Sequence, residues 1–395
     1  MSESTLYTPS GTAPLFVKNS LNAISQGQRK LIVIQLNGGN DGLNTIVPYR
    51  NDIYYNARPT LSIKKNKIID INGDVGFHKS MKVFADLFNR GLVSVINRVG
   101  YPNASRSHFK SMDFWQGGGN FKTGWLGRYL DTIQMTPDTM PAVEISDVLT
   151  RVLRGETNKG VAFDDLEELH HDISNPLVNE AIRLGRSNQI QNNDNLEYIY
   201  NVITSGKDFI DPAYEKYSHR PELTQFPDTD FGNQLKLIAG MIASGVNTGI
   251  YYATHGTFDT HVGQDKKHSR LLQTLSDAVG SLVASLEQTN HFQDTCILIF
   301  SEFGRRVKEN GGKGTDHGAG NSMYVISPNL KTPGFFNNYD PLTELVKGDL
   351  PFDIDFRQIY AGILEDWLGA ESEHILKKRF NKLDLFSDRV QEMIS

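Results

Sequence analysis

Short apolar runs rich in β-branched residues recur along the chain and predict the strands of a central sheet. The clearest run is Cys296-Ile-Leu-Ile-Phe300, and the others lie at 30–36, 92–96, 248–254 and 322–326. A continuous apolar run of this length is typical of a strand that is buried on both faces. We therefore expect a sheet that packs against other elements on each side.

Several segments between these runs have apolar residues at the spacing of an α-helix. In the stretch 77–90 apolar residues recur on one helical face, and Gly91 ends the pattern. Further helices are predicted at 233–244, from His268 onward, and at 355–369. Strand, helix and strand in succession are typical of a parallel sheet with crossover helices, so the predicted fold class is α/β.

The composition agrees with a folded domain and excludes several classes of protein. The chain has 395 residues, of which 38% are hydrophobic and 22% charged, enough to bury a core. Its net charge is −6 and no segment is strongly basic, so we expect no nucleic-acid partner. Cys296 is the only cysteine, which excludes an intrachain disulfide and a zinc site built from several cysteines. No run approaches the roughly 18 apolar residues of a membrane-spanning helix.

Three regions differ in character along the chain. Residues 29–395 are expected to form a single domain. Within it, the polar region at about 141–220 is rich in Asn and Asp and is expected to form a cap or insertion over the sheet. Residues 1–28 are interpreted either as a disordered leader or as the remnant of an export signal, since small and apolar residues occur there without a basic segment before them.

The first cluster of polar residues follows the run 30–36. Asp41 lies there in the glycine-rich turn Asn37-Gly-Gly-Asn-Asp41. Glycine allows positive φ and close backbone approach, so this turn at a strand end is a good position for a metal-binding carboxylate. The alternative is that Asp41 is an Asx-turn residue that only supports the loop.

The second cluster, Ser105-Arg106-Ser107-His108, follows the run 92–96 and precedes an amphipathic helix. Ser105 or Ser107 is then either a helix cap or a nucleophile at the helix N-terminus, where free N–H groups favour an anion. Arg106 would add a planar pair of donors for a tetrahedral oxyanion.

Two further clusters carry carboxylates and imidazoles. Asp259 and His261 lie two apart on an extended segment and face the same side, a spacing that suits one zinc or manganese ion. The alternative for this pair is a hydrogen-bonded surface loop. The last cluster begins with Glu302 and Arg305 at the end of the run 296–300 and continues, after a glycine-rich loop, with Asp316-His317.

All four clusters follow predicted strands, so they are expected to meet at the carboxyl edge of a parallel sheet. Their ligand types are oxygen and imidazole without thiolate. This favours one or two divalent cations, from among zinc, manganese, calcium and magnesium. Two such cations beside a hydroxyl nucleophile suit displacement at phosphorus or sulfur.

Several motifs resemble a known family. They are LNGGNDGLNTIVPY, SRSHF, GWLGRYL, FDTH, SEFGRRVKENGGKGTDHG and a helix that ends in DWLG. Together they are similar to the bacterial family called domain of unknown function 1501, which is related to the alkaline phosphatase and sulfatase superfamily. The resemblance implies an alkaline phosphatase-like α/β fold, with a mainly parallel central sheet flanked by helices on both faces. It also implies a two-metal site at the carboxyl edge of that sheet.

The resemblance also implies roles for single residues. Asp41 matches the first metal-binding aspartate, and Ser107, or else Ser105, falls at the nucleophile. Asp259 and His261 resemble the ligand pair of one metal, and His317 resembles the late histidine. At Glu302 the superfamily usually has an Asp-His pair, whereas this chain has Glu-Phe, so that site loses an imidazole.

These observations lead to two main hypotheses, and a transferase that uses the same covalent intermediate stays open as a third. The first is a metal-dependent hydrolase of a phosphate or sulfate ester with Ser107 as nucleophile. In it, Arg106 or Arg305 holds the anion, and His108 or His317 handles the leaving-group proton. The metal ligands are drawn from the following set: Asp41, Asp259, His261, Glu302, Asp316 and His317. The second hypothesis is a non-catalytic protein on the same fold that binds an anionic glycan.

The expected partner and location follow from these hypotheses. The partner is a small anionic ester or a sulfated or phosphorylated glycan. Many members of the family carry a twin-arginine export signal, which implies a periplasmic or exported protein. No such arginine pair occurs near the start of this sequence, so a cytoplasmic location stays open.

Overall fold

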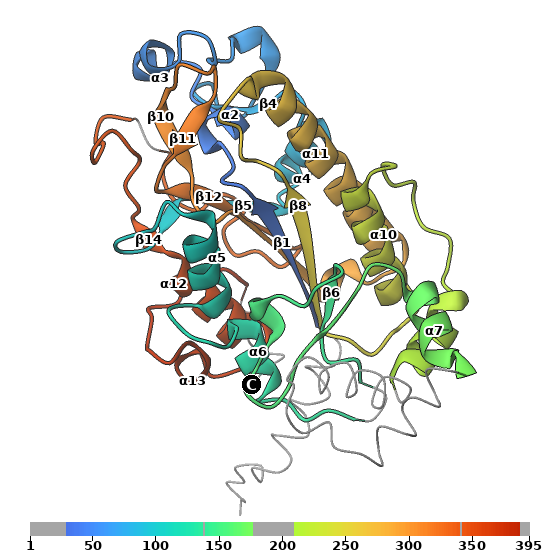
Figure 1. Ribbon diagram of the computed structural model, residues 1–395. Helices are drawn as coiled ribbons and strands as arrows, with labels where there is room; N and C mark the ends of the chain where they lie inside the picture. Colours follow the sequence, from blue (N-terminus) through green and yellow to red (C-terminus); the bar gives the residue numbers. More distant parts are fainter. Residues whose placement is uncertain (1–28, 137–138, 177–208, 340–341, 388–395) are drawn as a thin grey trace, which may run out of the picture.

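A mixed sheet forms the centre of the protein (Figure 1). The computed structural model describes residues 29–136, 139–176, 209–339 and 342–387. Within these residues the sheet has nine strands: β1 (Lys30–Asn37), β5 (Val93–Gly100), β6 (Val143–Ile145), β7 (Val161–Phe163), β8 (Ile250–Gly256), β9 (Thr295–Phe300), β12 (Asn321–Ile326), β13 (Gly334–Phe335) and β14 (Ile354–Asp355). Their order is β13-β5-β12-β9-β1-β8-β6-β7, and β14 also pairs with β5.

Most of these strands run in parallel. β1 pairs in parallel with β8 on one side and with β9 on the other. β12 is antiparallel to both β5 and β9, so β5 runs in the same direction as β9 and β1. The carboxyl ends of β1, β5, β8 and β9 therefore lie at one edge, as the sequence predicted, and the fold class is confirmed as α/β with a mainly parallel sheet.

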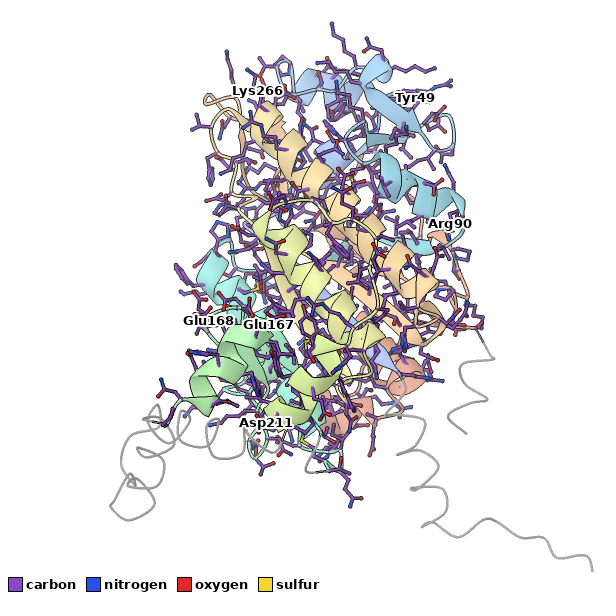
Figure 2. The ribbon with its side chains drawn as sticks, turned by 90° about the vertical axis from the view of Figure 1, so that its right-hand side faces the viewer. Tyr49, Arg90, Glu167, Glu168, Asp211 and Lys266 are labelled. Carbon is purple, nitrogen blue, oxygen red and sulfur yellow. The ribbon has the colours of Figure 1, made fainter. Side chains whose placement is uncertain are left out.

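Helices cover both faces of the sheet (Figure 1). One face packs against α4 (Lys82–Asn89), α7 (Leu166–Ser174), α10 (Asp230–Ala243) and α11 (Gln264–Gln288). The other packs against α5 (His108–Gly117), α6 (Trp125–Leu130), α12 (Phe356–Gly362) with its π-helical continuation Ile363–Trp367, and α13 (Ser372–Leu376). Figure 2 views the first of these faces, with Lys266 near the start of α11 and Glu167 and Glu168 near the start of α7 on the outer surface.

The strand β9 shows why the central apolar runs are continuous. Its six residues are all buried. Ile297 and Ile299 belong to the core on the α10 and α11 side, whereas Cys296, Leu298 and Phe300 belong to the core on the α5 and α12 side. Successive side chains of a strand point to opposite faces, so a sheet covered twice needs an apolar residue at every position.

Smaller elements complete the fold. A three-stranded sheet consists of β2 (Ile46–Val47), β3 (Ile68–Asp70) and β4 (Gly76–His78), and it lies with the short helices α2 (Gly42–Thr45) and α3 (Asp52–Ala57). A hairpin consists of β10 (Arg305–Glu309) and β11 (Thr315–His317). Short 3₁₀ helices occur at Lys65–Lys67, Arg151–Leu153 and Phe292–Asp294. The hairpin lies beyond the carboxyl ends of the central strands, at the top of Figure 1.

The structure differs from the expectations in three places. Phe77, expected to begin a helix, lies in β4, where pairing with β2 and β3 overrides the local helical pattern. The helix expected from His268 begins earlier, at Gln264. Part of the region expected to form a cap instead supplies β6 and β7 to the edge of the main sheet, where β6 pairs with β8.

Two further expectations concern the ends of the chain and the membrane. Residues 1–28, interpreted as a leader, lie outside the described residues, as do residues 177–208 of the expected cap. Among the described residues, no helix is both long and apolar enough to cross a bilayer.

Candidate metal centre at the carboxyl edge of the sheet

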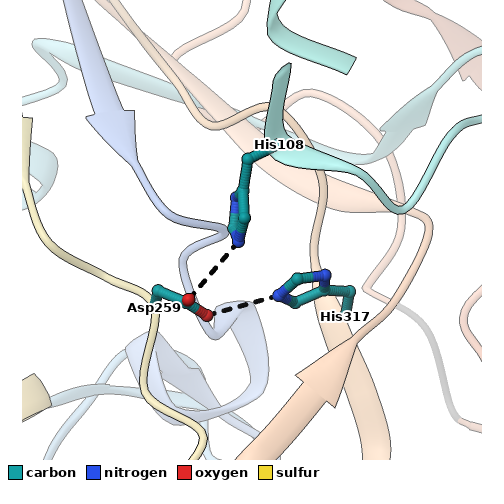
Figure 3. A group of neighbouring side chains, drawn as sticks. All are labelled: His108, Asp259 and His317. Atoms are coloured by element: carbon teal, nitrogen blue, oxygen red, sulfur yellow. Dashed lines mark hydrogen bonds and ion pairs between the residues drawn. The ribbon is translucent and has the colours of Figure 1, made fainter. Parts of the chain in front are cut away.

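Residues from three separate strand ends meet at the carboxyl edge of the sheet. Asp259 follows β8, His108 is the first residue of the helix that follows β5, and His317 ends β11. One ligand atom from each lies within 4.8 Å of the other two (Figure 3). His108 and His317 are about 200 positions apart in the sequence with Asp259 between them, and the parallel sheet brings the three together.

The distances between His108, Asp259 and His317 allow one cation to contact all three. Nε2 of His108 lies 3.5 Å from Oδ2 of Asp259, and Nε2 of His317 lies 3.3 Å from Oδ1 of Asp259. Nε2 of His261 lies 3.1 Å from that Oδ1 and 2.9 Å from Nε2 of His317. Tetrahedral ligand atoms at about 2.0–2.1 Å from zinc would lie roughly 3.3 Å apart. We define the group of His108, Asp259 and His317, together with the adjoining His261, as the metal centre.

Each imidazole of the metal centre is fixed through its other nitrogen. Nδ1 of His317 donates to the carbonyl oxygen of Arg106 at 2.7 Å. Nδ1 of His108 lies 2.7 Å from Oε1 of Glu302. Nδ1 of His261 lies 3.2 Å from Oδ1 of Asp316. A carbonyl or a carboxylate can only accept, so Nδ1 of each ring donates, and a neutral ring then has the lone pair of Nε2 free for a cation. Because Nε2 of His261 and Nε2 of His317 are 2.9 Å apart, a proton or a cation must lie between their lone pairs. Metal-binding histidines show this arrangement.

His108 gives the most direct indication that a ligand belongs here. Its Nε2 is buried and has no hydrogen-bond partner among the described residues. A buried polar atom without a partner costs free energy, and most such atoms in folded proteins have one. A cation between Nε2 of His108 and the carboxylate of Asp259 would satisfy it, so the residues present fit a metal ion.

The charges of the metal centre also suit a cation. Burial alone would raise the pKa of Asp259, but the hydrogen bond and the charge of Arg305 lower it to about 2, so the carboxylate is ionised at neutral pH. Burial lowers the pKa of His317, which favours the neutral ring that binds metals. The hydrogen bond to Glu302 raises the pKa of His108. A cation and a proton compete for this ring, so metal binding is favoured at higher pH.

Glu302 lies behind the metal centre, although it was predicted to be a metal ligand. Its side chain is fully buried. It accepts hydrogen bonds from the backbone N–H of Gly38 at 2.9 Å and from the hydroxyl of Ser301 at 3.1 Å, besides its contact with His108. The structure therefore places Glu302 as the residue that orients His108. Asp316 holds the equivalent position behind His261.

Asp41 lies outside the metal centre, in contrast to the prediction that it binds metal. Both of its oxygens are bonded to Arg58, at 2.6 and 3.0 Å, and Gln264 donates to one of them. Asp41 and Arg58 are 1% and 0% exposed. The desolvation that would raise the pKa of Asp41 is outweighed by Arg58, so its pKa is lowered. Arg58 directly follows α3, and no pattern in the sequence pairs it with Asp41.

Arg305 was predicted to hold an anion, but its donors are committed elsewhere. It is fully buried, and it donates to the carbonyl oxygens of Gly39 and Thr315, each at 2.7 Å. It also donates to Oδ1 of Asp259 at 2.6 Å. Arg305, the first residue of β10, therefore joins the loops after β1 and β8 to the start of β11 and fixes the carboxylate of the metal centre.

Ser107 and Arg106 lie at the rim of the metal centre. Ser107 is exposed and directly precedes α5, but its side chain makes no capping hydrogen bond. The capping alternative is therefore not what the structure shows. Ser105 accepts from the backbone N–H of Ser107 at 3.2 Å. The guanidinium of Arg106 is 42% exposed and pairs with the buried carboxylate of Asp349.

Two glycines allow the loops around the metal centre to approach closely. Gly38 has a φ of +114°, and a Cβ there would lie 2.4 Å from the backbone nitrogen of Asp259. A Cβ on Gly314 would lie 2.3 Å from the carbonyl carbon of His261. Contacts this short exclude any side chain, so the metal centre depends on glycine at both positions.

The fold and the site together define a class: α/β proteins with a candidate cation site at the carboxyl edge of a mainly parallel sheet. The chain belongs to the family described as "Protein of unknown function (DUF1501)", whose profile matches residues 28–331. This match confirms the family that the motifs resembled. No curated protein shows significant similarity to the sequence.

Several solved structures have a similar fold. Ps i-CgsB in complex with k-i-k-neocarrahexaose is 12% identical, with 90% of this chain and 75% of that chain covered and a TM-score of 0.43. The PsFucS1 sulfatase from Pseudoalteromonas sp. is 12% identical, with 94% and 75% covered and a TM-score of 0.40. The lipoteichoic acid synthase LtaP from Listeria monocytogenes is 10% identical, with 82% and 74% covered and a TM-score of 0.34. At these values the similarity concerns the general fold alone.

Proposed function

We propose that this protein is a metal-dependent hydrolase of phosphate or sulfate esters. One divalent cation would be held by His108, Asp259, His261 and His317. The observation that carries the proposal is the arrangement of the three imidazoles, each fixed through Nδ1 by a different acceptor. Around the carboxylate of Asp259 they present Nε2 atoms, one of which is buried without a hydrogen-bond partner.

The donor set favours zinc or manganese over calcium or magnesium. Three imidazole nitrogens and one carboxylate suit borderline cations, whereas calcium and magnesium prefer oxygen ligands. We infer one cation rather than two, because Asp41 is committed to Arg58 and Glu302 to His108. When bound, such a cation lowers the pKa of a nearby nucleophile and stabilises negative charge on the ester oxygens.

Ser107 is the proposed nucleophile. It is exposed beside His108, and its hydroxyl is not used as a helix cap. Its oxygen would form a bond to phosphorus or sulfur as the ester bond breaks, and the alcohol would leave with a proton. Water would then release phosphate or sulfate and restore the serine.

Metal content and ester turnover test the proposal. We expect the purified chain to bind about one zinc or manganese ion and to hydrolyse p-nitrophenyl phosphate or p-nitrophenyl sulfate. His317→Ala should lose both the metal and the turnover, whereas Ser107→Ala should keep the metal and lose turnover. His171→Ala is the matched control, because His171 is 82% exposed on α7. Equal metal content in His317→Ala and His171→Ala would overturn the metal centre.

A second candidate is the non-catalytic protein that binds an anionic glycan. The absence of free ligands for a second cation at Asp41 and Glu302, within the described part of the chain, favours it over a two-metal enzyme. Metal binding without turnover of either ester, together with glycan binding that survives chelation, would select it. The periplasmic or exported location stays a prediction that cell fractionation tests.

A further inference from the structure

A pocket lies beside the metal centre and has no part in the proposed chemistry. Its volume is about 650 Å³, within the usual range of ligand sites, and it is lined by residues from 100–106, 319–320 and 346–352. We call it the 346–352 pocket. Arg106 joins the two sites, because its carbonyl oxygen holds His317 and its side chain lines the pocket.

A tight turn places Asp349 in the wall of the pocket. Val346 and Asp349 exchange backbone hydrogen bonds of 3.0 and 3.1 Å. Lys347 and Gly348, between them, have φ values of +54° and +81°. Positive φ at both central residues is typical of a type I′ turn. The turn leaves Asp349 only 2% exposed.

Asp349 carries an oxygen that lacks a donor. Its Oδ2 accepts from the guanidinium of Arg106. Its Oδ1 is buried and has no hydrogen-bond partner among the described residues, and Nε of Arg306 lies 3.8 Å away, beyond hydrogen-bond distance. A buried carboxylate oxygen without a donor costs free energy, so a ligand that donates a hydrogen bond would be favoured here.

The surroundings of Asp349 select the kind of donor. Arg106 and Arg306 already place two positive charges near the carboxylate, so a neutral hydroxyl is favoured over a further cation. The aromatic residues Tyr101 and Phe352 also line the pocket. Phe352 packs directly against Gly100, because a Cβ added to Gly100 would lie 2.8 Å from the Cβ of Phe352. A sugar ring offers both hydroxyl donors and an apolar C–H face that packs on an aromatic ring.

We propose that the 346–352 pocket binds a neutral sugar ring, with one ring hydroxyl donating to Oδ1 of Asp349 and the C–H face packing on Phe352. Because the pocket adjoins the metal centre, the ring would be the organic part of the ester. That role rests on the proposed function, whereas sugar binding itself does not require the metal. The substrate is therefore a sugar phosphate or a sugar sulfate.

Saturation-transfer NMR on the whole chain tests the pocket. The probes are methyl glycosides of glucose, galactose, mannose, fucose and N-acetylglucosamine, with ethanolamine as a cationic comparison. Binding is measured after treatment with a chelator and again with added zinc. Asp349→Asn keeps the shape of the side chain and removes its charge, and Phe352→Leu removes the aromatic face. Asp353→Asn is the matched control, because Asp353 is 51% exposed and pairs with Arg98 outside the pocket lining.

We expect at least one glycoside to bind with and without zinc, and to bind equally well to Asp353→Asn. Asp349→Asn and Phe352→Leu should each weaken binding by about tenfold or more, since each removes one of the two main contacts. Thermal unfolding of each variant shows that it is folded. Binding without zinc separates this inference from the metal centre. No binding of any glycoside, equal binding to all three variants, or binding of ethanolamine alone would overturn the proposal.

Discussion

The buried pair of Asp41 and Arg58 offers the sharpest test of the structure, because the sequence alone favoured a different role for Asp41. If Asp41 bound the cation, Asp41→Asn would remove the metal and leave the fold largely intact. If it instead pairs with Arg58, the same change should leave metal content unaltered and lower stability. The two roles therefore predict opposite results in two separate measurements.

The structure sets the size of the expected effect. The two side chains share hydrogen bonds of 2.6 and 3.0 Å and are 1% and 0% exposed. Removing one partner of a buried ion pair leaves an uncompensated charge and typically costs about 3–5 kcal/mol. Arg58 also donates to the carbonyl oxygens of Arg306 and Val307, each at 2.9 Å. We therefore expect Arg58→Met to lower the free energy of unfolding at least as much as Asp41→Asn.

Urea unfolding and metal analysis form the assay. The midpoint should fall clearly for Asp41→Asn and for Arg58→Met. The double variant should lose less than the sum of the two, because removing both charges leaves no unpaired ion. The pKa of Asp41 is lowered in the fold, so its contribution is present above the unfolded pKa and disappears as the pH falls through the folded pKa. A variant Asp41→Asn that loses the metal but keeps the wild-type midpoint would refute this account.

Three further predictions follow from the geometry. Glu302→Gln weakens the support of His108 and should lower zinc affinity about 10–100-fold in competition with a chelator, while Gln288→Glu, on the surface, should not. Gly38→Ala should lower the urea midpoint and the metal content together, because its Cβ would lie 2.4 Å from the backbone nitrogen of Asp259; unchanged values would contradict the close approach. Burial lowers the pKa of His255 to about 4, below its usual 6.5, so its contribution to stability is complete above pH 6.5 and is lost as the pH falls toward 4. The full loss of unfolding free energy amounts to about 3 kcal/mol, at about 1.4 kcal/mol per pKa unit. The urea midpoint of His255→Phe should therefore fall less between pH 7 and pH 5 than the midpoint of the wild type.

The sequence by itself determined the central strands and the edge at which the site lies. The run 296–300 is apolar at every position because its residues alternate between two cores. Asp259, His261 and His317 were predicted as ligands from their residue types and their positions after strands, and the structure brings these three together. Periodicity and strand ends are local properties, so a linear pattern predicts them.

The tertiary structure alone decided what each charged side chain does. Asp41, Glu302 and Arg305 had the right types and positions for a site, yet each is bonded to a side chain or a backbone group from another element of the fold. His108 joined the metal centre because Glu302 turns its Nε2 toward Asp259. The free energy of a buried charge depends on its nearest opposite charge and on the water removed around it. Both depend on distances in space, which the order of residues does not contain.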